Sequence, residues 1–228
     1  MRRQTVGLPA GGSAIARRIG SILRWEGLHG VTSRALARLG WRSFGIWARP
    51  LDEPVSSVGP ALPIEVRALG AGDVALYREL RPDAAAELDR RLRAGHACFV
   101  AVSAAGRMVA VTWVAVEPVK VPYLEREIVP GPGELYLFDI YVAPEQRGAR
   151  LAPRIFATVA ELHRAQGYRR ALCLIALYNR SSIRSHERMG FRRVGSIHAL
   201  AGGTIRTADV PSMIRASPGA GEARRARS

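Results

Sequence analysis

Apolar and polar positions in the second quarter of the chain repeat with the periods of strands and helices. The sequence IEVRAL (64–69) alternates, which is typical of a strand with one buried face. The apolar runs 98–102 and 108–116 are joined by AAGR, which predicts a β-hairpin. Between the first strand and the hairpin, Asp73 and Asp83 stand where helix N-caps are favoured, so a short helix is expected after each of them.

The next part of the chain alternates strands with helices. ELYLFDIYV (134–142) and RRALCLIALY (169–178) are apolar runs that predict strands buried on both faces. The helix after the first strand is expected to end at Gly167, and the helix after the second to run from Asn179 to Met189. The apolar face of the first helix carries Leu151, Ile155, Val159 and Leu162. FRRVGSI then resumes a strand, and this order predicts a right-handed crossover and a mixed sheet.

The segment between these two parts lacks a clear period. EPVKVPYLEREIVPGPG (117–133) is expected to be an irregular loop, and long loops in compact domains are often functional. Its Glu125 and Glu127 either attract a cationic substrate or form a solvated face.

The composition is that of a globular protein in a reducing compartment. Hydrophobic residues make up 48% of the 228 residues and charged residues 23%, which is sufficient for a buried core. No apolar run reaches the roughly 20 residues of a membrane-spanning helix, and no secretory signal pattern follows the N-terminus. Cys98 and Cys173 stand inside apolar strands and are expected to be buried, without a disulfide or a metal. We therefore expect a cytoplasmic protein that needs no metal.

Positive charge is concentrated outside the predicted domain. The formal net charge is +15, of which residues 1–50 carry +8 and residues 216–228 carry +2. This distribution predicts a basic, partly helical N-terminal arm (1–50) and a disordered basic tail (216–228). A linker rich in proline, serine and glycine (51–61) is expected to lead into one domain (62–215).

Within the arm, residues 14–40 have the pattern of a basic amphipathic helix, with Ile15, Ile19 and Ile22 opposite arginines. Such a helix fits a membrane surface or a partner protein. The alternative, which we favour, is a helix packed on the domain or on a second subunit, so the protein is expected to be a monomer or a homodimer. Nucleic acid is not an expected partner, because the chain has no basic stripe interleaved with aromatic residues.

The stretch EQRGARLAPRIFATV (145–159) combines a glycine-containing turn with the start of an amphipathic helix. A helix N-terminus offers unpaired N–H groups and a partial positive charge, which suit an anion such as phosphate. The stretch lacks both GxxxxGK[ST] and the three glycines of a dinucleotide-binding fingerprint. An ordinary strand-to-helix connection explains the turn about as well as an anion site does.

A second motif, NRSSIRSHERMGF (179–191), lies one strand later and changes this balance. Together the two motifs resemble the Gcn5-related N-acetyltransferase (GNAT) superfamily. In that family a strand ending in V-x-P leads into R/Q-x-x-G-x-G/A, and the matching positions are Val142, Pro144, Arg147, Arg150 and Ala152. A later N-x-x-[SA]-x-x-x-Y-x-x-x-G-F helix is matched by Asn179, Ser182, His186, Gly190 and Phe191. The resemblance covers roughly residues 62–198. It implies an α/β (α+β) fold, with a mixed, splayed sheet of about six to seven strands and about four helices.

The resemblance also implies a binding site for acetyl-CoA as the acyl donor. Strand-edge backbone at Ile140, Tyr141 and Val142 would pair with the pantetheine arm. The turn expected around the pyrophosphate consists of Arg147, Gly148, Ala149, Arg150, Leu151, Ala152 and Pro153, the last without an N–H. Asn179, with Ser182 beside it, would bind or adjoin the pantetheine.

Two residues depart from the family pattern. Arg150 stands where glycine is usual, and His186 stands where a tyrosine often protonates the leaving thiolate. Histidine suits that role, because either the imidazolium or a neutral imidazole N–H can donate a proton to a thiolate. The alternative is that His186 only packs or bonds backbone. For Arg150 we expect the backbone N–H to face the pyrophosphate while the side chain points outward.

A base or a chain of water molecules must accept the proton that the attacking ammonium loses. Asp139 lies in an apolar strand beside the expected thioester, where burial would raise the pKa of its carboxyl. A structural role for Asp139, hydrogen-bonding loop amides, is the favoured alternative, and Glu134 at the start of the strand is the second candidate base.

These features predict an N-acyltransferase that transfers an acetyl group to a primary amine by direct attack in a ternary complex. One alternative is a GNAT-like domain that binds acyl-CoA without catalysis. Another is an acyltransferase peripheral to a membrane that uses an acyl-carrier protein as donor, motivated by the basic arm. The sequence does not select the acceptor amine.

Overall fold

The computed structural model describes residues 42–55, 63–121, 124 and 126–199, together with the backbone of 205–208 and 214–216. The strands are β1 (Arg42–Pro50), β2 (Ile64–Ala68), β3 (Ala97–Ser103), β4 (Met108–Ala115), β5 (Val119–Val121), β6 (Arg126–Ile128), β7 (Glu134–Val142), β8 (Arg170–Ala176), β9 (Arg192–Ala199), β10 (Ile205–Ala208) and β11 (Ile214–Ala216). The α-helices are α2 (Val74–Leu80), α3 (Ala85–Arg93), α4 (Leu151–Ala165) and α5 (Arg180–Arg188). The predicted amphipathic helix of the arm and the predicted disordered tail lie outside the described residues.

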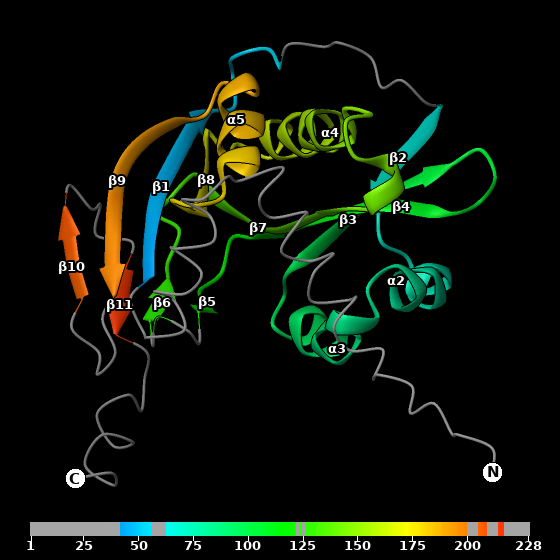
Figure 1. The fold of residues 1–228 in the computed structure, drawn as a ribbon, viewed down its shortest axis with the longest axis horizontal. Coiled ribbons are helices and arrows are strands. Elements are labelled where there is room, and N and C mark those ends of the chain that lie inside the picture. The colour runs from blue at the N-terminus through cyan, green and yellow to red at the C-terminus, as the bar shows by residue number, and fades with distance from the viewer. Residues whose placement is uncertain are drawn as a thin grey trace, which may run out of the picture.

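A mixed eight-stranded sheet forms the centre of the fold, in the order β10–β9–β1–β8–β7–β4–β3–β2 (Figure 1). Only β7 and β8 pair in parallel among the described strands, and the crossover between them is α4. The mixed sheet and the four flanking helices confirm the predicted fold class. The predicted hairpin is also confirmed, because β3 and β4 pair antiparallel around residues 104–107.

The strand β1 was not predicted, because Arg42–Pro50 had been placed in the N-terminal arm. It lies in the middle of the sheet, antiparallel to both β8 and β9. Its side chains alternate between the two faces: Trp47 belongs to the core cluster on the α4–α5 side, near Ile183 of α5, and Ile46 and Ala48 pack on the opposite side. The run SFGIWA is therefore a buried strand, and its apolar pattern was obscured by the arginine-rich segment in front of it.

Residues 117–133 are also more regular than predicted. They contain β5 and β6, which pair with each other, and β11 adds to form a small antiparallel sheet in the order β11–β6–β5. Val119, Val121 and Ile128 are buried beneath the central sheet. Strands of three residues carry too short a pattern to stand out from a loop in the sequence. Glu127 lies on β6 opposite Lys120 of β5.

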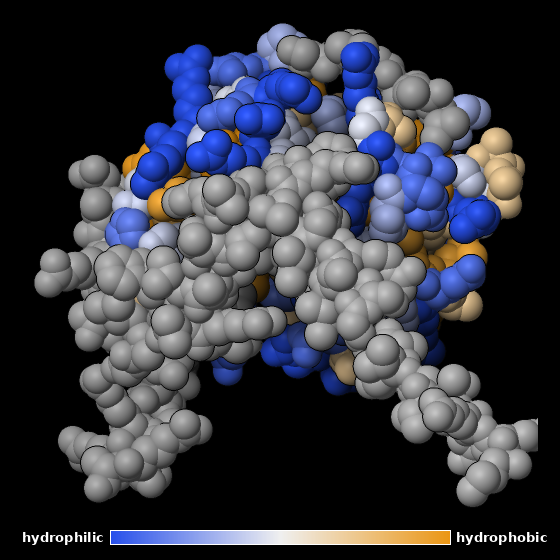
Figure 2. Space-filling model, in the orientation of Figure 1, coloured by the Kyte–Doolittle hydropathy of each residue, from blue (hydrophilic) through white to orange (hydrophobic). Residues whose placement is uncertain are grey.

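Helices cover both faces of the central sheet. In Figure 1, α4 and α5 lie on one face, and α2 and α3 lie on the other. The outer side of α5 is hydrophilic (Figure 2). The buried face of α4 is centred on Val159 and extends through Phe156 and His163, which leaves Leu162 at its edge with 44% exposure. The prediction that Leu162 belongs to the buried face is therefore wrong.

Cys98 and Cys173 are buried, as predicted, and both are free thiols.

Candidate active site

The sheet opens between β7 and β8. These parallel strands pair from Glu134–Arg170 to Leu137–Cys173, and beyond Leu137 only β4 continues beside β7. Within β7, Leu135–Leu137 are buried, whereas Glu134 and the residues from Phe138 to Val142 are partly exposed. The strand is thus buried on both faces only in its first half, because it loses its β8 neighbour in the second.

A β-bulge lies where the strands part. The pairs Trp113–Phe138 and Val111–Tyr141 flank one residue on β4, Thr112, but two residues on β7, Asp139 and Ile140. Asp139 has φ of +50°, a left-handed conformation that non-glycine residues rarely adopt. The bulge sends the two residues to opposite sides of the sheet. Asp139 contacts residues of the α2–α3 layer, whereas Ile140 lines a cavity under α4.

The turn into α4 follows β7 directly. It begins with a 3₁₀ helix, Pro144–Gln146, and the N–H of Ala149 donates to the Gln146 carbonyl at 3.2 Å. Gly148 has φ of +90°, and a Cβ at this position would meet nothing within 4 Å, so the conformation itself favours glycine here.

Arg150 is the N-cap of α4 and is left-handed, with φ of 58° and ψ of 30°. The position where the family usually has glycine is therefore one where glycine is the unstrained residue. An L-residue in this conformation costs roughly 1–2 kcal/mol. The side chain of Arg150 is exposed.

The turn is suited to an anion. The first N–H groups of a helix have no intrahelical acceptor, and the N–H of Ala149 is already bonded within the turn. The donors left for a ligand are therefore the N–H groups of Gly148, Arg150, Leu151 and Ala152. The exposed arginines of this segment add positive charge to the N-terminal dipole of α4. These arginines are Arg147, Arg150 and Arg154.

A small cavity lies under α4 beside the parting of the strands. Its lining consists of Thr112, Leu137, Ile140, Ala152, Ile155, Phe156 and Met189. The cavity connects the sequence motifs in space, because it contacts the end of the paired part of β7, the first turn of α4 and the residue after α5.

Asn179 is the N-cap of α5. Its Oδ1 accepts from the N–H of Ser182 at 3.1 Å and from Oγ of Ser181 at 2.9 Å. The side-chain oxygen of Asn179 is therefore committed to starting the helix. If Asn179 binds pantetheine as predicted, the amide NH₂ group of its side chain is the group that donates the hydrogen bond.

His186 lies buried at the end of α5. Its Nδ1 is 2.7 Å from the carbonyl oxygen of Ser182, so Nδ1 carries the proton and donates it. Burial lowers the pKa of this imidazole, partly offset by the same hydrogen bond. A neutral ring in this tautomer has no proton on Nε2, and the geometry therefore does not support donation from His186 to a thiolate.

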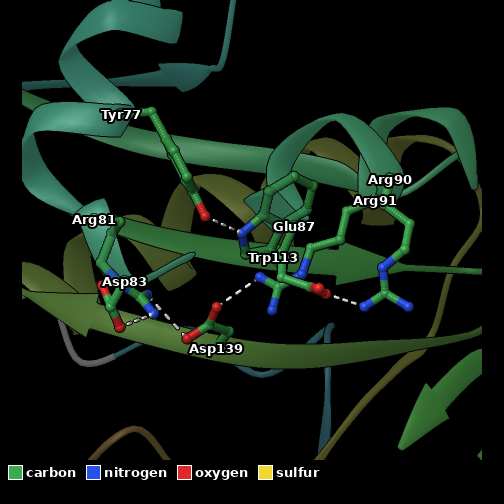
Figure 3. Close-up of polar contacts among 8 residues, drawn as sticks. All are labelled: Tyr77, Arg81, Asp83, Glu87, Arg90, Arg91, Trp113 and Asp139. Atoms are coloured by element: carbon green, nitrogen blue, oxygen red, sulfur yellow. Dashed lines mark hydrogen bonds and ion pairs between the residues drawn. The ribbon is translucent and has the colours of Figure 1, made fainter. Parts of the chain in front are cut away.

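Asp139 is not an isolated carboxylate. Its Oδ1 lies 2.9 Å from Nη1 of Arg81, and its Oδ2 lies 2.5 Å from Nη1 of Arg91 (Figure 3). Arg81 also bonds Asp83, and its guanidinium stacks on the Tyr141 ring. Burial alone would lower the pKa of Arg81, but the hydrogen bonds and charges of the two carboxylates raise it. Asp139 thus joins the bulge to the α2–α3 layer, in place of the predicted lone base or loop-amide contact.

Glu134 lies at the closed end of the β7–β8 pair. Its carboxylate accepts from the N–H of Gly131 at 3.0 Å and from Arg170 at 3.3 Å. It stands three positions before Leu137, which is roughly 10 Å along a strand. Glu134 therefore closes the loop before β7 rather than facing the open part of the sheet.

Sequence reasoning missed Arg81, Arg91 and Thr112. Nothing in the neighbourhood of the arginines distinguishes them from the many others in the chain. Thr112 does carry a signal, because it is the one polar residue in the strand sequence MVAVTWVA.

Within the described ranges, no three His, Cys, Asp or Glu side chains converge to hold a metal ion, and no helix of these ranges is long and apolar enough to cross a membrane.

Residues 69–191, more than half of the chain, match the model of the acetyltransferase (GNAT) family. The chain belongs to this family. The match includes both motifs, the turn into α4 and the helix α5 with Gly190 and Phe191. A comparison with curated proteins gives no match.

Solved structures resemble the GNAT chain at low sequence identity. A putative GNAT acetyltransferase from Novosphingobium aromaticivorans is 20% identical over 75% of this chain and 66% of its own length, with a TM-score of 0.49. AAC(6′)-Iy in complex with the bisubstrate analogue CoA-S-monomethyl-acetylneamine is 20% identical over 57% and 92%, with a TM-score of 0.48. An acetyltransferase from Trypanosoma brucei is 24% identical over 57% and 93%, with a TM-score of 0.43.

Proposed function

We propose that this protein is an acyl-CoA-dependent N-acyltransferase that moves an acetyl group from acetyl-CoA to a primary amine. One observation carries the proposal: β7 parts from β8 after Leu137, and the parted strand leads directly into the left-handed turn at Gly148 and Arg150. A long ligand with a polyphosphate at one end and amide groups along its arm matches this arrangement.

In this proposal the pyrophosphate of coenzyme A accepts hydrogen bonds from the free N–H groups of the turn. The pantetheine arm lies along the edge of β7 at residues 140–142, where backbone groups no longer face β8. Its amides extend the sheet in the manner of an added strand. The thioester then reaches the cavity beside the bulge.

The reaction is a direct transfer. The amine nitrogen attacks the thioester carbonyl carbon, the C–S bond breaks, and the coenzyme A thiolate leaves while the attacking nitrogen loses a proton. In this proposal neither Asp139, which is ion-paired, nor His186, whose Nδ1 proton is donated to a backbone carbonyl, serves as the base or the acid. Protons therefore move through water, and the rate depends mainly on holding the two substrates in reactive contact.

The ion pairs of Asp139 and the Nδ1 hydrogen bond of His186 also favour one alternative, a domain that binds acyl-CoA without transferring the acyl group. Calorimetric titration with acetyl-CoA, followed by thiol release across a panel of primary amines, separates the two. Binding with thiol release supports the transferase, and binding without release on any amine supports the alternative. If acetyl-CoA does not bind at millimolar concentration, both proposals fail, and the carrier-protein donor becomes the function to test.

A further inference from the structure

Thr112 is a buried hydroxyl without a partner. Its residue is 2% exposed, and its Oγ1 makes no hydrogen bond with any group of the described structure. Leaving a hydroxyl buried and unpaired costs roughly 1–3 kcal/mol. Buried polar groups are nearly always satisfied, so an exception calls for an absent partner.

The hydroxyl belongs to the cavity beside the bulge. Its neighbours on β4, Val111 and Trp113, pack in the core under α2 and α3, whereas Thr112 faces the cavity under α4. The bulge places Ile140 of β7 beside Thr112 on the neighbouring strand, and the side chains of both residues line the same cavity. The cavity lies where β7 has just separated from β8.

The lining restricts what the cavity can hold. Six of its seven residues are apolar, and the only side-chain hydrogen-bonding group is the hydroxyl of Thr112. The cavity is small, about 10 Å³, which is about the space that one water molecule needs. It therefore admits a single acceptor atom rather than a whole acyl group, and the carbonyl oxygen of a thioester, an atom of the same kind and size as a water oxygen, meets this description.

We propose that Thr112 Oγ1 donates a hydrogen bond to the carbonyl oxygen of the acyl group and so distinguishes acyl-CoA from free coenzyme A. This inference rests on the proposed function and deepens it. The carbonyl oxygen gains negative charge as the amine attacks, so the hydrogen bond strengthens in the transition state and assists catalysis as well as binding.

The test compares Thr112→Val with Thr112→Ser. Valine has the same shape without the hydroxyl, and serine retains the hydroxyl. Calorimetry measures the Kd of the full-length protein for acetyl-CoA and for coenzyme A, which has no acyl carbonyl. In Thr112→Val, acetyl-CoA is expected to bind about tenfold more weakly while coenzyme A binds as before. In Thr112→Ser, the preference for acetyl-CoA is retained and kcat stays closer to that of the wild type than in Thr112→Val.

The Tm of the ligand-free protein distinguishes a ligand-binding hydroxyl from one that stabilises the fold. Removing an unpaired hydroxyl should leave Tm of Thr112→Val unchanged or raise it. A lower Tm means that the hydroxyl has a partner within the protein, and this overturns the inference. An unchanged ratio of the two Kd values in Thr112→Val overturns it too, because the hydroxyl then binds only water. Failure of the wild type to bind either compound refutes the proposed function itself, which is a distinct outcome.

Discussion

Asp139 and Arg81 are 58 residues apart in the chain, and their side chains meet at 2.9 Å between Oδ1 and Nη1. Together with Arg91 on the other carboxylate oxygen, the contact fixes the β7 bulge to the helical layer that covers it. The bulge is the point at which the sheet opens. This ion pair therefore holds the open edge in place, and it also removes Asp139 from the set of free bases.

The first prediction concerns this carboxylate. Asp139→Asn keeps the shape and tolerates a positive φ, but it removes the carboxylate charge that Arg91 and Arg81 share and leaves Arg81 with Asp83 alone. We expect the free energy of unfolding to fall by about 1–3 kcal/mol, less than for a fully buried pair because Asp139 is partly exposed. Urea denaturation measures this change.

Activity of the same variant tests the assignment of roles. If Asp139 is structural, kcat of Asp139→Asn stays within about tenfold of the wild type at a temperature where the variant is folded, whereas loss of a general base costs about 10²–10⁴-fold. A drop of that size, together with a lost limb in the pH–rate profile, would restore Asp139 as the base.

The second prediction separates strain from charge at Arg150. Arg150→Gly removes the strain of the left-handed conformation, and the greater backbone entropy of glycine in the unfolded chain offsets part of this gain. We therefore expect the free energy of unfolding to rise by about 0.5–1 kcal/mol relative to the wild type. Arg150→Gln retains the strain and should not stabilise the protein. Both variants lose the guanidinium and should bind coenzyme A about 3–10-fold more weakly. Tighter binding by Arg150→Gly would show that the arginine obstructs the turn.

The third prediction uses two matched glycines, each with positive φ after the end of a helix. Gly167 has φ of +90° and Gly190 has φ of +86°, but only at Gly190 would a Cβ meet a neighbour, Nε of Arg49 at 3.1 Å. Arg49 is buried and held by the carbonyls of Glu53 and Pro54, so it cannot withdraw easily.

Alanine at Gly167 should therefore cost only the backbone strain, about 1 kcal/mol, whereas alanine at Gly190 should cost about 1 kcal/mol more. Chemical denaturation of the two variants gives the comparison. Equal losses would mean that Arg49 moves aside freely.

The fourth prediction is a loss of stability in mild acid. Burial lowers the pKa values of His96, His163 and His186, with the charges of Arg91 and Arg90 adding to the effect at His96. Below the unfolded value of about 6.5, the unfolded chain binds protons that the folded chain does not, so stability falls as the pH falls. The slope is at most about 1.4 kcal/mol per pH unit for each histidine.

Urea midpoints between pH 7.5 and 5.5 check this dependence. The carboxyls of Asp73 and Asp83, whose pKa values are lowered by hydrogen bonds to Arg67 and Arg81, lose their contribution only at a lower pH and do not confuse the result. His163→Asn should reduce the dependence of the free energy of unfolding on pH by the contribution of one histidine, at most about 1.4 kcal/mol per pH unit. A slope that this substitution does not change would contradict the prediction.

Sequence patterns alone determined the order of most elements and both family motifs. Helix ends at Gly167 and Gly190 and the start of α5 at Asn179 were predictable, because capping depends on one residue's conformation or on a hydrogen bond three residues away. The turn at 145–152 was predictable for the same reason. Interactions over such short distances leave a record in the local sequence.

Only the tertiary structure decided the features that depend on distant partners. The insertion of β1 between β8 and β9, the bulge at Asp139 and its contact with Arg81 each join segments far apart in the chain. The tautomer of His186 follows from a carbonyl that the helix happens to present, and the unpaired hydroxyl of Thr112 becomes apparent only once every nearby donor and acceptor has been placed. A residue's type and spacing limit the chemistry it can perform, whereas its protonation and its partners are set by what the folded chain packs against it.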